Sequence, residues 1–305
     1  MAYDSHCNIL PFYGLNNCEF RQLIEPDSNR LASMIKDSHF KEHIMRILEQ
    51  NMLIMNECQY YTEERLRNVI EHNKFELSIL HLNIRSMDKH LGELMALIAN
   101  LDFNFDVIAL TEIGAKNIPN RLATIRDRYN GEYMLPKTNR YGGACILVKK
   151  GIEYHIRNDL CLNCENVEDI WIACRIKSHE IVVGSVYRHP GGKIEPFKEC
   201  LENVAFILQN EKCQAFICGD FNVDGCKVNL NSQTANFYKS LLTQNFIPTK
   251  MLLTRITGYS LTLIDNILMR FDANEDRITA GNIYSDISDY LPNFILIKRR
   301  HELNK

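Results

Sequence analysis

The pattern of apolar and polar positions changes near residue 74, and the part before it predicts helices. Apolar residues recur at spacings of three and four over residues 26–48, which predicts one helix. A second, shorter helical pattern runs from Thr62 to His72, with Thr62 as N-cap and Glu63 and Glu64 in the first turn, where negative charge suits the helix dipole. These helices offer little apolar surface for a core of their own. We therefore expect residues 1–74 to be a helical extension that either docks on the rest of the chain or is partly disordered.

From Phe75 onward, short apolar strands alternate with amphipathic helical segments. The predicted strands cover residues 77–84, 107–113, 144–149, 170–176, 181–187, 214–218, 261–268 and 294–298. The predicted helices cover residues 88–100, 196–209 and 234–244. Strands joined by short turns imply antiparallel neighbours, and strands joined through a helix imply parallel ones. The pattern therefore predicts an α/β fold with two mixed sheets flanked by helices.

Composition narrows the class of protein without identifying a function. The 305 residues are 46% hydrophobic and 24% charged, which is typical of a soluble globular chain with one large domain or two small ones. The formal net charge of −3 excludes a strongly basic nucleic-acid coat but allows a local basic patch beside an acidic metal site. Eleven cysteines, an odd number, suit reduced thiols better than a disulfide framework. Since no secretory signal and no apolar run of roughly 18 residues is visible, we expect a nuclear or cytoplasmic protein that is neither secreted nor membrane-bound.

Polar residues gather where the predicted strands end. The apolar run at residues 215–217 leads into Cys218-Gly219-Asp220-Phe221-Asn222, and side chains two apart in an extended chain point the same way. Alone, an Asp-x-Asn sequence after a strand is more often a turn, because both residues bond their own backbone. Polar residues also stand at or near the ends of other strands, namely Asn83, Glu112, Tyr187, Asp265 and Asp289. Six such positions together indicate a polar site at one edge of the sheets.

Eight short motifs occur in a fixed order along this part of the chain. They are Leu82-Asn83-Ile84-Arg85-Ser86, Thr111-Glu112, Arg140-Tyr141-Gly142-Gly143, Tyr187-Arg188-His189-Pro190, Gly219-Asp220-Phe221-Asn222, Thr254-Arg255-Ile256-Thr257, Leu263-Ile264-Asp265-Asn266-Ile267, and Gly281-Asn282-Ile283 through Ser288-Asp289. The ordered set resembles the endonuclease/exonuclease/phosphatase superfamily, and most closely the apurinic-like endonuclease domain of non-LTR retrotransposons. The resemblance covers about residues 75–298. It implies a deoxyribonuclease-like four-layer α/β sandwich over residues 75–300, followed by a tail at residues 301–305.

The resemblance also implies metal-dependent hydrolysis of a DNA phosphodiester. Water must attack in line while charge grows on the phosphoryl oxygens, and a divalent ion held by carboxylates stabilises that charge. Mg²⁺, or Mn²⁺ in its place, prefers oxygen ligands, and no small-molecule cofactor is expected besides the metal. By resemblance, Glu112 would hold the metal with help from Asn83 and Asp289.

The same resemblance assigns roles to the other polar residues. Asp220 and Asn222 would orient or deprotonate the attacking water, and Tyr187 would hydrogen-bond the phosphate or steady the leaving oxygen. Asp265 would orient a catalytic histidine. The candidates for phosphate contacts with DNA are Arg85, Arg140, Arg188 and Arg255.

The chain departs from the family at Tyr290. Where the family has Ser-Asp-His before a proline, this chain has Ser288-Asp289-Tyr290-Leu291-Pro292. A phenol, with a reference pKa near 10, cannot exchange protons at neutral pH as imidazole does or present a cation to a phosphate. General acid–base help of this kind is typically worth about 10² to 10⁴ in rate. We therefore expect a weakened or inactive nuclease, with His81 and His189 as possible substitutes whose more ordinary role is packing.

Three functions from different classes stay open. The first is a retrotransposon endonuclease, normally associated with a reverse transcriptase. The second is a non-catalytic nucleic-acid- or protein-binding module of the same fold, and Tyr290 is the residue on which these two differ. The third is a phosphatase of the superfamily, which the Arg-Ile-Thr and Gly-Asn-Ile motifs make less favoured. Gly114 is a second departure, near a loop expected to face DNA, and the sequence leaves the oligomeric state open.

Overall fold

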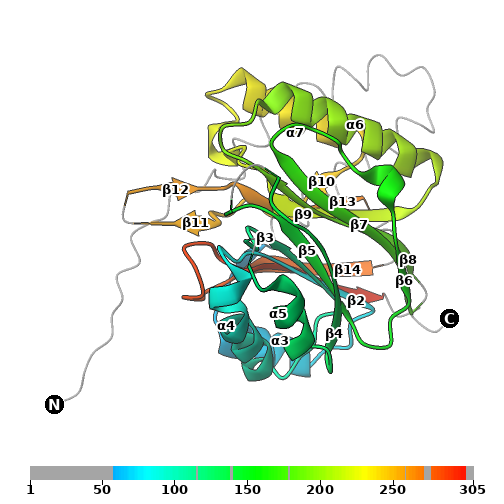
Figure 1. Cartoon of the computed structure of the whole chain (residues 1–305), viewed down its shortest axis with the longest axis vertical. Coiled ribbons are helices and arrows are strands. Elements are labelled where there is room, and N and C mark those ends of the chain that lie inside the picture. Colours follow the sequence, from blue (N-terminus) through cyan, green and yellow to red (C-terminus); the bar gives the residue numbers. More distant parts are fainter. Residues whose placement is uncertain are drawn as a thin grey trace.

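Strand pairing builds two mixed β-sheets that face each other (Figure 1). The computed structural model describes residues 58–114, 116–137, 140–177, 179–257, 259–270 and 276–299. Along the first sheet the order is β1 (Gln59–Tyr61), β14 (Asp276–Ile283), β15 (Asn293–Arg299), β2 (Leu77–Asn83), β3 (Val107–Thr111), β5 (Ala144–Lys149) and β4 (Tyr129–Met134). Along the second it is β10 (Ile247–Pro248), β13 (Asp265–Arg270), β9 (Gln214–Asp220), β8 (His179–Arg188), β7 (Val167–Ile176) and β6 (Tyr154–Ile156). Each sheet combines parallel and antiparallel pairs, for example β2 with β3 (parallel) and β13 with β9 (antiparallel), as the sequence predicted.

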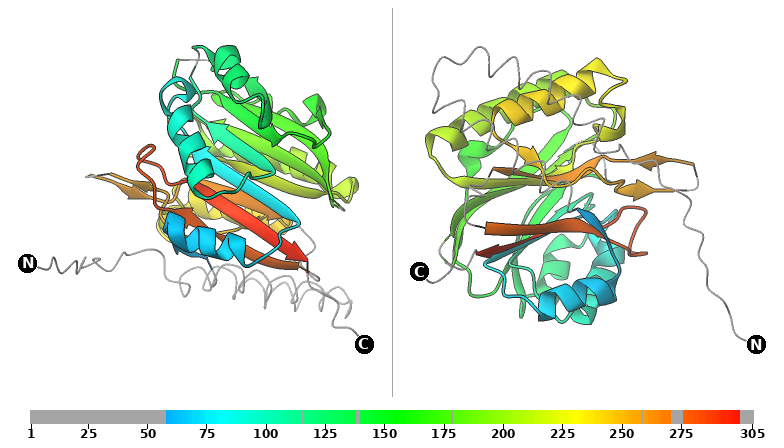
Figure 2. Two further views of the ribbon diagram at one scale, coloured as in Figure 1. Left: turned by 90° about the horizontal axis from the view of Figure 1, so that it is seen from below. Right: turned by 180° about the vertical axis from the view of Figure 1, so that it is seen from behind.

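Helices cover the outer face of each sheet, so that the molecule has four layers (Figures 1 and 2). The helices on the first sheet are α3 (Glu63–Glu71), α4 (Met87–Asn100) and α5 (Ile118–Thr124), and those on the second are α6 (Ile194–Asn210) and α7 (Ser232–Thr243). Side chains along β2 point alternately to the two faces of the sheet. Leu77 and Ile79 pack between the sheets, whereas Leu80 and Leu82 pack under the helices, so this strand contributes to two hydrophobic cores. The four-layer α/β sandwich expected from the resemblance is confirmed.

The described residues before position 74 dock on the first sheet. Thr62 caps α3, its hydroxyl accepting a hydrogen bond from the amide of Arg65 at 3.2 Å, as its position predicted. Tyr61 in β1 pairs with β14 and packs edge-on against Phe294 at 5.2 Å, and Leu66 in α3 is buried. Sheet pairing thus begins before the division expected near residue 74, and docking is one of the two outcomes the sequence left open. The predicted helix at residues 26–48 and the tail at residues 301–305 lie outside the described residues.

The strand predicted over residues 261–268 is divided in the structure. Leu261–Thr262 form β12, which pairs with β11 (Arg255–Ile256) in a hairpin that projects from the body (Figures 1 and 2), and β13 begins only at Asp265. Between them, the amide of Leu263 donates to Asp224 Oδ1 at 3.1 Å, and the amide of Ile264 donates to Thr254 Oγ1 at 3.2 Å. Because these side chains replace strand neighbours as acceptors, the chain turns, and Asp265 starts a new strand opposite Asp220 at the end of β9.

Two simpler features accompany this architecture. The cysteines of the described segments are free thiols, as their odd number and scatter predicted. Among the same segments, no helix is long and apolar enough to cross a membrane.

Candidate active site

The ends of five strands bring the predicted polar residues to one edge of the two sheets. In the first sheet, Asn83 ends β2 beside Thr111 of β3, which Glu112 follows. In the second, Asp220 at the end of β9 pairs with Tyr187 on one side and with Asp265 on the other. The structure therefore gathers residues from both sheets, and the hydrogen bonds below join them.

Asn83 connects the two sheets at this edge. Its Nδ2 atom donates to Glu112 Oε1 and to Asp220 Oδ2, both at 2.8 Å, and its Oδ1 accepts from the amide of Arg85 at 3.2 Å. Asn83 is fully buried. A carboxamide with both ends bonded is fixed in orientation, and it holds the two carboxylates within reach of one small ligand.

Glu112 is held in an unusual backbone conformation at the mouth of the site. Its φ of +52° lies in the left-handed region, which residues other than glycine seldom adopt. Burial raises the pKa of the Glu112 carboxyl, although the hydrogen bond from Asn83, the charge of Arg85 and a hydrogen bond from the Tyr187 hydroxyl oppose this. The side chain is still 13% exposed, so a ligand can reach it.

Asp220 makes a turn and faces the site at the same time. Its Oδ1 accepts the amide of Asn222 at 3.0 Å, the local bond that makes Asp-x-Asn a common turn. Its Oδ2 is the atom bonded by Asn83. Burial, followed by the charges of Asp265 and Glu112, raises the pKa of Asp220 well above its ordinary value.

Asn222 lies next to these groups but serves the backbone. Its Nδ2 donates to the carbonyl of Arg188 at 2.6 Å, which ties the loop after β9 to the end of β8. Its φ of +48° fits this tight loop, since Asn tolerates the left-handed region better than most residues. Its role in orienting water stays a prediction.

Asp265 is buried and has protein partners other than histidine. Its Oδ2 accepts a hydrogen bond from the Thr254 hydroxyl at 2.8 Å, while Oδ1 is buried without a hydrogen-bond partner in the described part of the chain. Burial raises the pKa of Asp265 to about 7, and the nearby Lys250 opposes that rise.

Tyr290 lies buried beneath two arginines. The Arg255 guanidinium is 5.3 Å from the ring centroid and that of Arg85 is 6.0 Å away. Both guanidiniums also bind Asp289, Arg85 at 2.6 Å and Arg255 at 3.2 Å. Burial, then the charge of Asp220, raises the pKa of Tyr290 far above its ordinary value, so the phenol keeps its proton throughout the neutral range.

The oxygen atoms at this edge suit a hard divalent cation. Glu112, Asn83 and Asp289 offer only oxygen or amide groups, the ligand type that Mg²⁺ prefers. Burial alone would raise the pKa of Asp289, but the hydrogen bonds from Arg85 and Arg255 outweigh it and leave that pKa below its ordinary value. Arg85 also lies 3.9 Å from Glu112, so one guanidinium spans both carboxylates. Within the described ranges, no group of three or more His, Cys, Asp or Glu side chains is arranged to hold a metal, and the metal site stays a prediction.

The four candidate arginines fall into two groups. Arg85 and Arg255 are partly exposed beside Asp289, and Arg140 is exposed with its guanidinium over the Tyr141 ring. Arg188 differs, because it is buried and donates to the carbonyls of Phe221 and Asn222, both at 2.6 Å, and to that of Gly192. In this structure its guanidinium fastens the loops after β8 and β9, so the structure does not support the predicted phosphate contact for Arg188.

Gly114 joins the loop after β3 to the loop before β5. Its amide donates to the carbonyl of Gly142 at 3.0 Å, and its φ of +78° is one that residues with side chains rarely adopt. The departure from the family at this position therefore has a local backbone reason.

The two histidines considered as substitutes have partners other than Asp265. His81 is buried between Thr111 and Asn293, and burial holds its pKa well below the ordinary value. His189 bonds Glu168 at 2.8 Å, and its ring packs edge-on against Tyr187 at 4.8 Å. Sequence reasoning missed Glu168, which precedes the predicted start of its strand at residue 170, and Lys250, which lies in an apolar stretch that gave no signal of a site.

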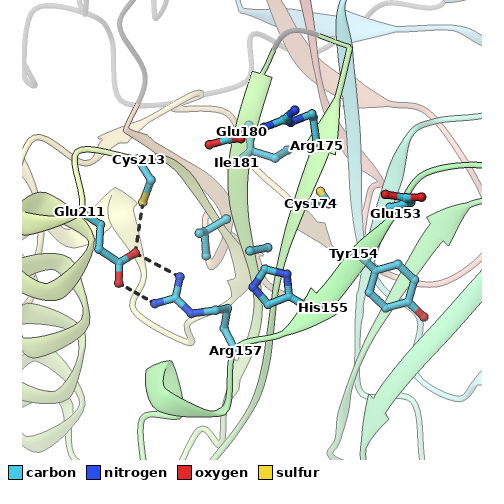
Figure 3. Close-up of a pocket in the computed structure, with 12 residues that line it drawn as sticks. Glu153, Tyr154, His155, Arg157, Cys174, Arg175, Glu180, Ile181, Glu211 and Cys213 are labelled. Atoms are coloured by element: carbon cyan, nitrogen blue, oxygen red, sulfur yellow. Dashed lines mark hydrogen bonds and ion pairs between the residues drawn. The ribbon is translucent and has the colours of Figure 1, made fainter.

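Two cavities among the described residues differ in their relation to the candidate site. One, of about 570 Å³, opens between β6, β7, β8 and the end of α6 (Figure 3), and its lining includes the ion pairs of Arg157 with Glu211 and of Arg175 with Glu180. None of the predicted site residues lines it. A second, of about 790 Å³, adjoins the site, since Asp289 and Ile256 form part of its wall.

Known proteins support the fold and the family. Residues 80–277, more than half of the chain, match the Endonuclease/Exonuclease/phosphatase family. No curated protein matches the sequence. Among solved structures, the endonuclease domain of TRAS1, a telomere-specific non-LTR retrotransposon, is 14% identical, with 73% of this chain and 99% of that chain covered and a TM-score of 0.59.

Two further structures show the same fold. The 3′-5′ exonuclease NExo from Neisseria meningitidis is 15% identical, with 73% of this chain and 100% of that chain covered and a TM-score of 0.57. TDP2 from D. rerio, complexed with a single-strand DNA product, is 14% identical, with 73% and 98% covered and a TM-score of 0.52. With the family match and the convergence of Asn83, Glu112 and Asp220, this chain belongs to the endonuclease/exonuclease/phosphatase family.

Proposed function

We propose that the chain is a divalent-metal-dependent phosphodiester hydrolase of the retrotransposon endonuclease type, and that Tyr290 leaves it weakened or inactive. The observation that carries the proposal is Asn83, whose Nδ2 bonds both Glu112 and Asp220 at 2.8 Å at the edge where the two sheets meet. DNA is the proposed substrate. Endonucleases, an exonuclease and a DNA-bound relative among the similar structures support that substrate class.

The residues divide the chemistry between them. A bound Mg²⁺ or Mn²⁺, held by Glu112 with Asn83 and Asp289, would supply positive charge for the phosphoryl oxygens. Asp220 is the base that takes a proton from the attacking water, because its raised pKa favours proton uptake once it is ionised. The Tyr187 hydroxyl, already a donor to Glu112, is placed to turn toward a phosphate oxygen. Arg85 and Arg255 bind Asp289 in the free protein and exchange that carboxylate for a DNA phosphate.

The missing step is the one that histidine would perform. An imidazole at position 290 would lie between Asp265 and the phosphate, and it could gain or lose a proton near neutral pH. The phenol of Tyr290 holds its proton too tightly to exchange it at neutral pH and carries no positive charge. This supports a nuclease that still binds DNA but hydrolyses it slowly or not at all.

A second function is favoured by the packing of Tyr290 itself. The ring belongs to the core under α4 and is only 4% exposed. Ion pairs of Arg85 and Arg255 with Asp289 fill the site above it. A buried Tyr290 covered by ion pairs also suits a non-catalytic DNA-binding module. No observation specifically favours a phosphatase. A nuclear or cytoplasmic location stays a prediction.

Nicking and binding, measured on the same DNA, separate these functions. Supercoiled plasmid is incubated with Mg²⁺ and either the unaltered protein or Tyr290→His, and duplex binding is measured with EDTA present. The proposal predicts similar binding by both proteins and nicking mainly by Tyr290→His. Binding without nicking by either protein favours the non-catalytic module, and absence of both contradicts the proposal.

A further inference from the structure

Lys250 is a fully buried lysine directly behind the active site. It lies just after β10, is 0% exposed, and its Nζ donates to the main-chain carbonyl of Asp265 at 3.1 Å. Its own carbonyl accepts from Asn266 Nδ2 at 2.9 Å, which fixes the backbone beside β13. Burying an ammonium is costly unless an opposite charge and hydrogen bonds compensate it. One neutral carbonyl does not provide that charge.

The Asp265 carboxylate is the opposite charge within reach of Lys250. Thr254 bonds only one of its oxygens, and the other, Oδ1, is buried without a hydrogen-bond partner in the described segments. Attraction between the two groups lowers the pKa of Asp265 and raises that of Lys250, in each case against the effect of burial. Two buried groups of opposite charge type, each incompletely bonded, therefore belong to neighbouring residues, and the Lys250 ammonium contacts the main chain of Asp265 itself.

Other ionisable groups near this pair do not replace it. Lys250 faces the thiol of Cys58 and the imidazole of His81, and burial keeps both groups uncharged at neutral pH by raising the pKa of Cys58 to about 12 and lowering that of His81. The ionisable groups that face Asp265 from neighbouring elements, besides Lys250, are Asp220, Glu112, Arg255, Tyr238 and Tyr290. Of these, Arg255 is the cation, and it is partly exposed and bound to Asp289.

We propose that Lys250 is a positioning residue of the active site, which supplies from the interior a positive charge that stabilises the buried Asp265 carboxylate. The attraction favours the ionised form of Asp265 against the effect of burial, and the hydrogen bond to its carbonyl fixes it beside Asp220, its neighbour across the β9–β13 pair. The charge relationship concerns the folded protein alone, and its catalytic consequence rests on the proposed hydrolase function. Lys250 does not touch the substrate, since it is closed off between the sheets.

A double-mutant cycle tests the charge pair without any need for activity. The folding equilibrium is measured by urea denaturation for the full chain, Lys250→Met, Asp265→Asn and the double variant. We expect the double variant to be at least about tenfold more folded than the product of the single effects, because each single change leaves one buried charge alone. The excess should disappear as the pH falls below about 7, because the Asp265 carboxyl, whose pKa burial raises to about 7, then takes up its proton, whereas a packing effect would persist.

A matched cycle pairs Lys250→Met with Asp169→Asn. Asp169 is also buried and accepts from Trp171 Nε1 at 2.7 Å, but it lies on β7, three strands from β13 in the same sheet. This pair should be additive. Additivity in both cycles, or a double variant no better folded than Lys250→Met, overturns the proposal, and so does equal coupling in both cycles.

Activity then tests the positioning role. In the Tyr290→His background, Lys250→Met should lower kcat at least about tenfold with little change in KM, because DNA contacts are untouched. An unchanged kcat overturns the positioning role. If no variant nicks DNA at all, the proposed function fails while the folding cycle still decides whether the charge pair exists.

Discussion

Asp220 and Asp265 lie directly opposite each other where β9 pairs with β13. Both side chains are buried, and burial together with their mutual repulsion raises the pKa of Asp220 well above its ordinary value. At neutral pH the fold therefore concentrates acidic groups that would be more stable in water. Such arrangements are common at functional sites, where stability is given up for chemistry.

The stability of Asp220→Asn, measured relative to the unaltered protein, should increase as the pH rises. Since the folded pKa of Asp220 lies above its unfolded value of 3.8, the stability that its proton contributes is complete below about pH 4 and is lost as the pH rises toward the folded pKa. Asparagine removes this loss, by about 1.4 kcal/mol for each unit by which the pKa is displaced. Urea denaturation with EDTA at acidic and at mildly alkaline pH measures the gain. A gain independent of pH would contradict the assignment.

Arg188→Met should destabilise the protein without a specific effect on DNA. The substitution leaves the carbonyls of Phe221 and Asn222 without their donor, and an unsatisfied buried group costs about 1 to 3 kcal/mol. We expect a loss of at least about 2 kcal/mol in the free energy of unfolding. The matched change Arg255→Met should cost less than about 1 kcal/mol, because that side chain is partly exposed. Equal losses would show that Arg188 does not fasten these loops.

Arg255→Ala should weaken DNA binding and reduce its dependence on salt. If the guanidinium exchanges Asp289 for a phosphate, its loss should lower the slope of log affinity against log salt concentration by about 1. Fluorescence anisotropy of a labelled duplex, from about 50 to 200 mM salt, measures the slope. Arg175→Ala is the control, since Arg175 pairs with Glu180 at the opposite end of β7 from Glu168. The same slope for Arg255→Ala as for the unaltered protein would remove Arg255 from the DNA contact.

Gly142→Ala should disturb the Glu168–His189 pair beside Tyr187. A Cβ atom at Gly142 would lie 2.7 Å from Glu168 Oε2, closer than Cβ atoms pack, and would make a tight contact of 3.0 Å with His189 Cε1. Forced shifts of this kind typically cost about 1 to 3 kcal/mol. Gly92→Ala, in α4 with nothing within 4 Å, should instead stabilise by about 0.5 to 1 kcal/mol. Thermal unfolding of both variants measures the contrast, and a neutral Gly142→Ala would mean that the pair moves freely.

Most of the fold follows from hydrophobic periodicity, and the exceptions have physical causes. β4 (Tyr129–Met134) is an edge strand with half-exposed side chains, and its Asn-Gly pair is typical of a turn rather than a strand. β1 has only three residues and is stabilised by pairing with β14, a neighbour more than 200 residues away. Local patterns carry no information about such a partner.

The site residues at strand ends could be predicted because strand ends are visible in the sequence. Burial and partners could not be predicted in the same way. Arg188 looks like its neighbours in a basic motif, yet its contacts are backbone carbonyls. Lys250 looks like an interruption of an apolar stretch, yet its ammonium donates to the main-chain carbonyl of Asp265. In both cases the three-dimensional position of one long side chain decides its role.

The central claim is that an intact nuclease site is disabled at one residue. Its most direct test is the single-turnover rate of Mg²⁺-dependent plasmid nicking by the unaltered protein, by Tyr290→His, and by Tyr290→His combined with Asp220→Ala. We predict a rate for Tyr290→His at least about 100-fold above that of the unaltered protein, and loss of this activity with Asp220→Ala. Comparable nicking by the unaltered protein, or activity that survives Asp220→Ala, would contradict the account.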